Sequence, residues 1–224
     1  MPITFALLDE LQLREVRRLL QDAPWADGKA SAGTQASLAK NNAQLPPDCD
    51  AARTLKSLLT GALERSPRFL ASALPRKLFP PQFNRYAGPR NAYGPHVDNA
   101  VRFSGSLRVR TDLSCTVFLS APDEYDGGEL VIQGAGEAQS VKLPAGHAVL
   151  YPGTSVHEVT PVTRGVRLAS FFWIESMVRS DEQRQLLLQM DDAITALRTS
   201  QGENPSTIAL TGAYHNLLRM WADT

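Results

Sequence analysis

The sequence predicts a mainly β protein in which helices flank a sandwich or barrel core. Between residues 77 and 178, short apolar or β-branched runs alternate with turn residues such as glycine, proline and aspartate. These runs follow one another too closely for helical crossovers, so a parallel α/β sheet is not expected. The segments on both sides have the apolar spacing of helices. We therefore expect an N-terminal helical and extended support region (1–76), a β core (77–178) and a C-terminal helical subdomain (179–224).

The N-terminal region is expected to contain a short strand and two helices. The run TFALL indicates the strand, and Asp9 is placed to cap the first helix. The apolar face of that helix is predicted to comprise Leu11, Val16, Leu19 and Leu20. The polar stretch 25–44 predicts an extended hairpin or a loop. Asp48 or Asp50 is expected to cap the second helix, which Ser66-Pro67 ends.

The central region is predicted to form seven or eight short strands. The runs are KLFPPQFNRY, LSCTVFLS, ELVIQG, SVKL, HAVLYP, SVHEVTPV and GVRLASFFWI. Such strands with tight turns are typical of a sandwich or barrel, and a closed barrel or a double-sheet jelly roll also protects the edge strands. Ser180 or Asp181 then caps a helix, and another helix follows Asn204-Pro205. The apolar residues of this pair pack either on the chain's own core or in a homodimer contact.

Composition and charge exclude several classes of protein. Lys plus Arg and Asp plus Glu both number 23, so no overall charge indicates nucleic acid or an anionic membrane. No window approaches the roughly 20 apolar residues of a membrane span, and the N-terminus lacks the features of a signal peptide. Cys49 and Cys115 lack metal-ligand spacing and are expected to be buried thiols. We expect a cytoplasmic protein with neither a nucleic-acid nor a membrane partner.

Two histidines and an aspartate form the chemical centre of the predicted β core. His96 and Asp98 are separated by one residue, so an extended segment places both side chains on one face. Gly94-Pro95 is expected to form a turn or to start that strand, and His157 opens another strand after Pro152-Gly153. Two imidazoles and one carboxylate are the donor set of the facial triad that holds non-haem Fe(II) and leaves positions open for oxygen and a co-substrate. A zinc or manganese site is the alternative.

Arg167 lies in GVRLASFFW, a predicted strand with apolar residues on both faces. A buried guanidinium requires an anionic partner, and its planar fork suits a carboxylate. That partner is either a bidentate acid such as 2-oxoglutarate or a protein Asp or Glu in a buried salt bridge. Tyr86, one strand before the HxD motif, either hydrogen-bonds a bound acid or belongs to the core. The candidates for an apolar wall beside the site are Phe171, Trp173 and Val117.

Several other polar segments are assigned no ligand role. His147 is expected at the surface, and His215 is expected to pack in the last helix. The acidic run DEYDGGE lacks the spacing of an EF-hand loop and is predicted to be a tight hairpin turn with positive φ at its glycines. The segment 99–111 is either a lid that contacts an acidic or peptide substrate or a solvated loop. Its three arginines are Arg102, Arg108 and Arg110.

Four segments together carry a resemblance to a known family: RYAGPRNAYGPHVDN, DLSCTVFLSAPDEYDGGELVI, LPAGHAVLYPGTSVHEVTPVTRGVRLASFFWIES and YHNLLRMW. They resemble the bacterial PKHD-type hydroxylases, in the prolyl 4-hydroxylase branch of the Fe(II)/2-oxoglutarate dioxygenases. The resemblance implies a double-stranded β-helix, or jelly roll, with flanking helices. It implies that His96, Asp98 and His157 hold Fe(II), that Arg167 binds the distal carboxylate of 2-oxoglutarate, and that L-ascorbate keeps the iron reduced. Related halogenases lack the carboxylate, so Asp98 favours hydroxylation.

The implied reaction is hydroxylation of an unactivated C–H bond, with O₂ consumed and succinate and CO₂ released. The substrate is open between a prolyl or lysyl side chain of a protein and a small molecule. The same donor set is compatible with a non-catalytic cupin-like metal-binding or sensor module that does not depend on 2-oxoglutarate. A zinc- or manganese-dependent hydrolase is a third hypothesis, disfavoured because no general base is expected beside the triad.

Overall fold

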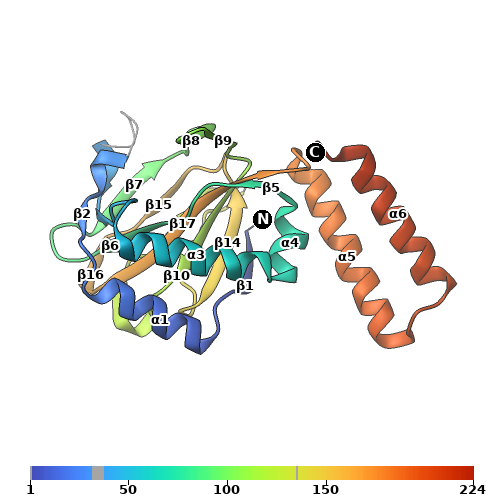
Figure 1. The fold of residues 1–224 in the computed structure, drawn as a ribbon, viewed down its shortest axis with the longest axis horizontal. Coiled ribbons are helices and arrows are strands. Elements are labelled where there is room, and N and C mark those ends of the chain that lie inside the picture. Colours follow the sequence, from blue (N-terminus) through green and yellow to red (C-terminus); the bar gives the residue numbers. More distant parts are fainter. Residues whose placement is uncertain (1, 32–37, 135) are drawn as a thin grey trace.

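Two β-sheets face each other in a jelly-roll core with flanking helices, which confirms the predicted fold class. The computed structural model describes residues 2–31, 38–134 and 136–224. The C-terminal helices form an antiparallel pair that extends away from the β core (Figure 1). None of the helices described is long and apolar enough to cross a membrane.

Within the described residues the larger sheet has eight strands, and every strand pair in it is antiparallel. Its strands lie in the order β1 (Ile3–Ala6), β14 (His147–Pro152), β10 (Leu113–Phe118), β17 (Arg167–Ser176), β6 (Gln82–Tyr86), β4 (Ala43–Gln44) and β2 (Ala26–Asp27), and β5 (Pro75–Leu78) also pairs with β17. The runs HAVLYP, LSCTVFLS and GVRLASFFWI, which were predicted to be strands, form the adjacent strands β14, β10 and β17 of this sheet. The stretch 25–44 contributes short strands, and its residues 32–37 lie outside the described part of the chain.

Among the described residues the smaller sheet has five strands, and it contains His96 and His157. Its order is β13 (Gln139–Val141), β12 (Leu130–Ile132), β15 (His157–Val159), β7 (Ala92–His96) and β3 (Lys40–Asn41). Two further antiparallel pairs are β11 (Tyr125–Gly127) with β16 (Val162–Gly165), and β8 (Val101–Ser104) with β9 (Leu107–Arg110). The segment 99–111 is thus largely a β-hairpin, where the sequence analysis considered a lid or a loop.

Gly94-Pro95 lies inside β7, so the expectation that it forms a turn or starts a strand is wrong. The neighbouring strand β3 pairs only with Ala92 and Tyr93, which leaves this side of β7 without a strand partner at Pro95 among the described residues. A proline, which has no N–H to donate, is tolerated at such an edge. His96 is therefore the last residue of β7, and Asp98 follows the strand rather than belonging to it.

The acidic run DEYDGGE was predicted to be a tight hairpin turn, and the strand pairing contradicts that. Its glycines do have positive φ, +70° at Gly127 and +67° at Gly128. However, β11 pairs with β16 and β12 pairs with β13 and β15, so the run joins strands of different sheets. A Cβ on Gly127 would lie 2.0 Å from the carbonyl oxygen of Pro161, which explains why the chain crosses here on glycine.

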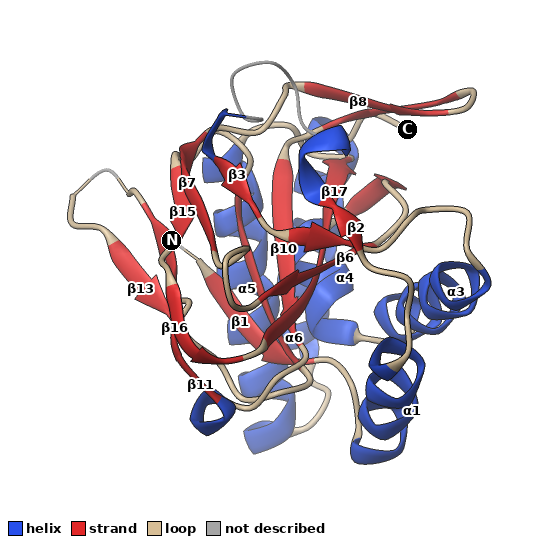
Figure 2. Cartoon of the chain, turned by 90° about the vertical axis from the view of Figure 1, so that its left-hand side faces the viewer, coloured by secondary structure: helices blue, strands red, loops and turns tan. Residues whose placement is uncertain are grey.

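The helices cover the outer side of the larger sheet and extend from the end of the core. They are α1 (Glu10–Gln21), α3 (Asp50–Glu64), α4 (Pro67–Ala73), α5 (Asp181–Gln201) and α6 (Pro205–Trp221), with short 3₁₀ turns η1 (Gly28–Ser31) and η2 (Pro122–Glu124). Figure 2 shows α1 and α3 on the side of the larger sheet that faces away from the smaller one. The predicted C-terminal helical pair is confirmed, with Ser180 as the N-cap of α5.

The helix caps confirm one prediction and correct another. The Asp9 side chain accepts a hydrogen bond from the backbone N–H of Gln12 (2.8 Å), as expected of an N-cap. In α3 the N-cap is Cys49, which makes no side-chain capping bond, so the assignment to Asp48 or Asp50 is wrong. Ser66-Pro67 both ends α3 and starts α4, because serine is a good N-cap and proline suits the first helical position.

The apolar core has two layers, one on each side of the larger sheet. Residues such as Leu55, Leu59, Phe83, Leu113 and Val117 fill the layer between the helices and this sheet. The layer between the two sheets is formed by residues such as Phe118, Leu130, Ile132, Val149 and Val159. Leu11, which was predicted for the apolar face of the first helix, is instead 70% exposed.

Candidate active site

A pocket of about 750 Å³ opens between the two sheets. The larger sheet contributes Asn84, Tyr86, Ser114, Thr116 and Arg167, and the smaller sheet contributes Tyr93, His96 and His157. The alternation of strand side chains explains the lining, because Leu113 and Val117 of β10 enter the core on the helix side while Ser114 and Thr116 face the pocket.

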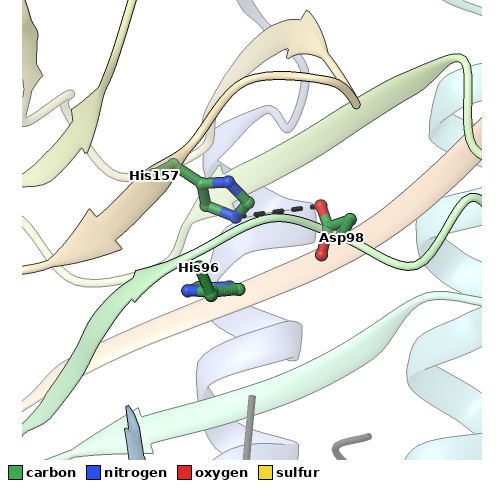
Figure 3. Close-up of side chains that lie close together, drawn as sticks. All are labelled: His96, Asp98 and His157. Carbon is green, nitrogen blue, oxygen red and sulfur yellow. Dashed lines mark ion pairs between the residues drawn. The ribbon is translucent and has the colours of Figure 1, made fainter. Parts of the chain in front are cut away.

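His96, Asp98 and His157 come together at this pocket (Figure 3). His96 on β7 and His157 on β15 are directly paired across antiparallel strands, and their ring centroids are 4.3 Å apart. One ligand atom from each of the three residues lies within 4.8 Å of the others. Ligand atoms arranged around one ion with bonds of about 2.1 Å are about 3 Å apart. Small side-chain adjustments would therefore let all three bind one ion.

Backbone carbonyls orient both imidazoles. The Nδ1–H of His96 donates to the carbonyl oxygen of Gly94 (2.8 Å), and the Nδ1–H of His157 donates to that of Ser155 (3.0 Å). This assignment leaves Nε2 of each ring as the atom available to a metal. Burial, together with the charge of His157, lowers the pKa of His96 to about 4. His96 is therefore neutral near pH 7, the form that binds a metal ion.

The aspartate is held from the opposite sheet. Its Oδ2 accepts a hydrogen bond from Ser114 Oγ (2.7 Å) and lies 3.8 Å from Nε2 of His157. Ser114 belongs to β10, so this bond fixes a carboxylate that follows β7 against a strand of the larger sheet. Ser114 was not among the residues predicted from the sequence.

Ser114→Ala is expected to weaken Fe(II) binding by about 10- to 100-fold, the effect of removing a hydrogen bond to a metal ligand. The small serine side chain leaves little volume to lose, so the midpoint of thermal unfolding should change little. Anaerobic Fe(II) titration of the variant and the wild type measures the effect. Ser170→Ala on β17, whose hydroxyl donates to the Gln82 carbonyl outside the triad, is the matched control. Equal Fe(II) affinity in the wild type and Ser114→Ala contradicts this role.

Arg167 is buried in the same pocket, and among the described residues its guanidinium has no hydrogen-bond partner. It is 1% exposed, and its Nε, Nη1 and Nη2 atoms make no hydrogen bond within the described part of the chain. Its guanidinium carbon lies 5.2 Å from the ring centroids of both Tyr86 and Phe118. Glu129, whose carboxylate pKa Arg167 helps to lower, instead accepts a hydrogen bond from Thr160 Oγ1 (2.6 Å). A buried cation of this kind fits the carboxylate of a bound acid.

Tyr86 lies beside Arg167 and is also buried. Its hydroxyl oxygen accepts a hydrogen bond from Asn84 Nδ2 (3.2 Å). Burial raises the pKa of Tyr86, which opposes loss of its proton, and the hydroxyl keeps a hydrogen to donate. The position of Tyr86 is thus compatible with both of its predicted roles, in the core and toward a bound acid.

Other residues singled out in the sequence lie outside the triad. His147 is half-buried at the start of β14, not at the surface as expected, and His215 is exposed on α6 instead of packed. Val117 is fully buried on the helix side of β10, so its assignment to the pocket wall is wrong, whereas Phe171 and Trp173 do line the pocket.

The arginines of the hairpin have separate roles. Arg110 forms an ion pair with Asp112 (2.6 Å), and Arg108 is exposed. Arg102 alone of the three lines the pocket. Lys40 lines it as well, from a polar stretch in which the sequence analysis identified no functional residue.

The jelly-roll fold and the two-histidine, one-carboxylate site define a class of protein, the 2-oxoglutarate and Fe(II) dependent oxygenases. A family model described as the 2OG-Fe(II) oxygenase superfamily matches residues 81–175, and one described as the PKHD-type hydroxylase C-terminal domain matches residues 181–223. A PKHD-type hydroxylase of Polaromonas sp. is 62% identical over 220 residues, 97% of each chain. One of Verminephrobacter eiseniae is 61% identical over 220 residues, again 97% of each. The chain belongs to the PKHD-type hydroxylase family.

Solved structures support the fold. A prolyl hydroxylase from Trichoplax adhaerens, in complex with a hypoxia inducible factor peptide fragment, aligns with a TM-score of 0.55 and 15% identity over 83% of this chain and 86% of its own. A Pseudomonas putida prolyl-4-hydroxylase aligns with a TM-score of 0.50 and 19% identity over 78% and 92%. The protein is thus an enzyme of the 2OG-Fe(II) oxygenase class, for which Fe(II), 2-oxoglutarate and O₂ are implied. This class excludes the non-catalytic module and the hydrolase considered from the sequence.

Proposed function

We propose that this enzyme hydroxylates an unactivated C–H bond and releases succinate and CO₂. The substrate is either a prolyl or lysyl side chain of a protein or a small molecule. The observation that carries the proposal is that three metal donors and a buried arginine line one pocket, and that this arginine makes no hydrogen bond to any carboxylate of the described residues. The donors suit Fe(II), and the arginine suits the second carboxylate of 2-oxoglutarate.

In this proposal the iron is bound by Nε2 of His96, by a carboxylate oxygen of Asp98 and by Nε2 of His157. Arg167 holds the distal carboxylate of 2-oxoglutarate through its planar fork, and the Tyr86 hydroxyl donates to the same group. When bound, Fe(II) and 2-oxoglutarate supply the oxidising chemistry that activates O₂. The role of the chain is to orient these groups before reaction.

The chain also keeps water from the reacting atoms. The Tyr93 ring stacks on the His96 ring at 3.6 Å, and the Tyr151 ring meets the His157 ring edge-on at 5.1 Å. Leu130 and Val159 line the pocket beside them. These contacts hold the imidazoles in one orientation and surround them with apolar surface, which strengthens the electrostatic interactions of the bound groups.

Four further features belong to the proposal. We infer the division into support region (1–76), catalytic core (77–178) and helical subdomain (179–224), and the use of L-ascorbate to keep the iron reduced. A cytoplasmic location is supported by the free thiols of Cys49 and Cys115. A homodimer through the C-terminal helices is supported by exposed apolar side chains there, including Ile208 (59%) and Met220 (76%).

Anaerobic reconstitution with Fe(II), followed by titration with 2-oxoglutarate, tests the proposal directly. A 2-oxo acid bound to Fe(II) through its keto and carboxylate oxygens gives a weak metal-to-ligand band in the visible range. We expect this band to appear in the wild type and to saturate with 2-oxoglutarate. Fe(II) binding without the band would contradict the role given to 2-oxoglutarate, and absence of Fe(II) binding would contradict the role given to the triad.

A further inference from the structure

Two asparagines line the pocket with buried polar atoms that make no hydrogen bond to any described residue. Asn42 is 1% exposed, and both its Oδ1 and its Nδ2 lack a partner. Asn84 is 7% exposed, and only its Oδ1 lacks one. A buried amide without hydrogen bonds is costly to a folded protein, so its presence in a pocket indicates that a ligand completes its bonding.

Asn42 lies where the chain passes from one sheet to the other. It follows β3 of the smaller sheet and precedes β4 of the larger one. In the larger sheet, Ala43 pairs with Arg85 of β6. Continued by one residue, this antiparallel register places Asn42 beside Tyr86, which pairs with Arg167 of β17. Asn42 is therefore at the end of the pocket where Arg167 is found.

The pKa of the Tyr86 hydroxyl supports this placement. Burial raises that pKa, whereas the charge of Arg167 and the amide of Asn42 lower it, so both groups lie near the hydroxyl. Among the described residues no hydrogen bond joins any two of these three side chains. They line the same pocket without bonding to one another, which leaves their hydrogen-bonding atoms for a ligand.

Gly28 determines which atom of the Asn42 amide is directed to the pocket. A Cβ on Gly28 would lie 2.0 Å from Asn42 Oδ1 and 3.2 Å from its Cγ, so the amide oxygen packs against the glycine backbone. The Gly28 N–H also donates to the Asn42 carbonyl oxygen (2.9 Å), which holds the two segments together. Nδ2 is the other end of the amide and is directed away from Gly28. Asn42 thus presents a donor to the pocket.

Two neighbouring polar side chains do not offer such a donor. Asn84 Nδ2 already donates to the Tyr86 hydroxyl (3.2 Å), and the remaining Oδ1 is an acceptor, which does not bind a carboxylate. The Tyr125 hydroxyl also makes no hydrogen bond to the described residues, but Tyr125 is not part of the pocket lining. Asn42 remains as a donor beside Arg167 and Tyr86.

We propose that Asn42 Nδ2 binds the distal carboxylate of 2-oxoglutarate together with Arg167 and Tyr86, and so favours a 2-oxo acid that has a second carboxylate. This inference rests on the proposed function and deepens it. A carboxylate offers about four acceptor positions. The planar fork of Arg167 uses two of them and the Tyr86 hydroxyl uses one, so the Asn42 amide takes the fourth. The N-terminal support region is then part of the co-substrate site.

The test compares two 2-oxo acids that differ only at the distal end. 2-Oxoglutarate has the second carboxylate, and 2-oxopentanoate has a methyl group in its place. Both chelate Fe(II) through the same keto and carboxylate oxygens, so the visible band reports the binding of each under argon, without turnover. Asn42→Leu, an apolar residue of similar shape, is expected to weaken 2-oxoglutarate binding by about 10- to 100-fold, the effect of one charge-assisted hydrogen bond. Binding of 2-oxopentanoate should not change.

Two other variants test the donor and its orientation. Asn42→Asp keeps the shape of the side chain and replaces the donor by a negative charge, so it should weaken 2-oxoglutarate binding more than Asn42→Leu does. Gly28→Ala should displace the Asn42 amide and also weaken binding of 2-oxoglutarate, but not of 2-oxopentanoate. The matched control is Asn41→Leu, at an exposed asparagine that donates to the Pro89 carbonyl oxygen (2.8 Å). It should bind both acids as the wild type does.

Thermal unfolding separates a binding role of Asn42 from a structural one. Asn42→Leu is expected to raise the unfolding midpoint of the ligand-free protein, because it removes two buried polar atoms that have no partner among the described residues. Added 2-oxoglutarate should stabilise the wild type more than the variant. A lowered midpoint, with equal weakening of both acids, would assign Asn42 to the fold and overturn the proposal.

Failure of this inference differs from failure of the proposed function. If the wild type gives the band with 2-oxoglutarate and Asn42→Leu binds 2-oxoglutarate equally well, the role of Asn42 is overturned while the iron site and Arg167 stand. If the wild type binds Fe(II) but gives no band with either acid, the proposed function is overturned, and the role of Asn42 with it.

Discussion

Asp98→Ala is expected to reduce 2-oxoglutarate turnover by about 10³-fold or more, to the level of protein without added iron. The side chain supplies one of three metal donors and is itself fixed by Ser114, so no neighbouring carboxylate in the described metal-ligand cluster can replace it. His96→Ala should have the same effect, because its Nε2 is directed to the same point. The measurements are anaerobic Fe(II) binding and succinate formation with excess 2-oxoglutarate.

The control for these variants is His215→Ala, which removes an exposed histidine on α6 far from the pocket lining. It should bind Fe(II) and form succinate as the wild type does. The thermal unfolding midpoint of each variant shows whether lost activity reflects lost folding. Full succinate formation by Asp98→Ala would rule out the proposed iron site.

Arg167→Met is expected to raise the 2-oxoglutarate concentration required for half-maximal turnover by about 10²-fold or more. Loss of two charge-assisted hydrogen bonds, each worth about 1.5–3 kcal/mol, accounts for an effect of this size. Fe(II) binding should be retained, because Arg167 lies on β17 and the donors lie on and beside β7 and β15. Titration of the visible band with 2-oxoglutarate measures the change directly.

The stability of Arg167→Met provides an independent check. A guanidinium that is 1% exposed and has no partner among the described residues should destabilise the ligand-free protein. Methionine in its place should therefore raise the free energy of unfolding without ligand, by about 1–3 kcal/mol. Added 2-oxoglutarate should stabilise the wild type more than the variant. An unchanged requirement for 2-oxoglutarate would contradict the assignment of Arg167.

The fold was largely predictable because its strands are regular and their turns are marked. The runs LSCTVFLS and GVRLASFFWI form β10 and β17 at the centre of the larger sheet. The predictions were wrong for residues whose type is tolerated at more than one place in a strand or helix. Pro95 was expected in a turn or at the start of a strand, yet the partly unpaired edge of β7 accepts it within the strand. An aspartate was expected to cap α3, yet the N-cap is Cys49, which makes no side-chain capping bond.

The site residues that could be predicted are those whose type is unusual in a predicted β-strand region. A buried arginine and an HxD motif stand out in a β-rich chain, so His96, Asp98 and Arg167 could be singled out. Ser114 and Lys40 could not, because serine and lysine are ordinary residues whose role depends on contacts across the fold. A usable signal was the polar face of a buried strand: Ser114 and Thr116 alternate with core residues, which indicates an internal cavity.

The pocket draws its functional side chains from both layers of the jelly roll. The two histidines belong to the smaller sheet, whereas Arg167 belongs to the larger one. In the proposed function, 2-oxoglutarate spans from one layer to the other, with its two ends bound on opposite sides. The distance between the two sheets is set by packed core residues such as Phe118 and Leu130. This distance therefore determines how long a diacid can be and still reach both ends of the site. Selection of a five-carbon diacid over shorter or longer homologues is then a property of the interior packing rather than of any single side chain.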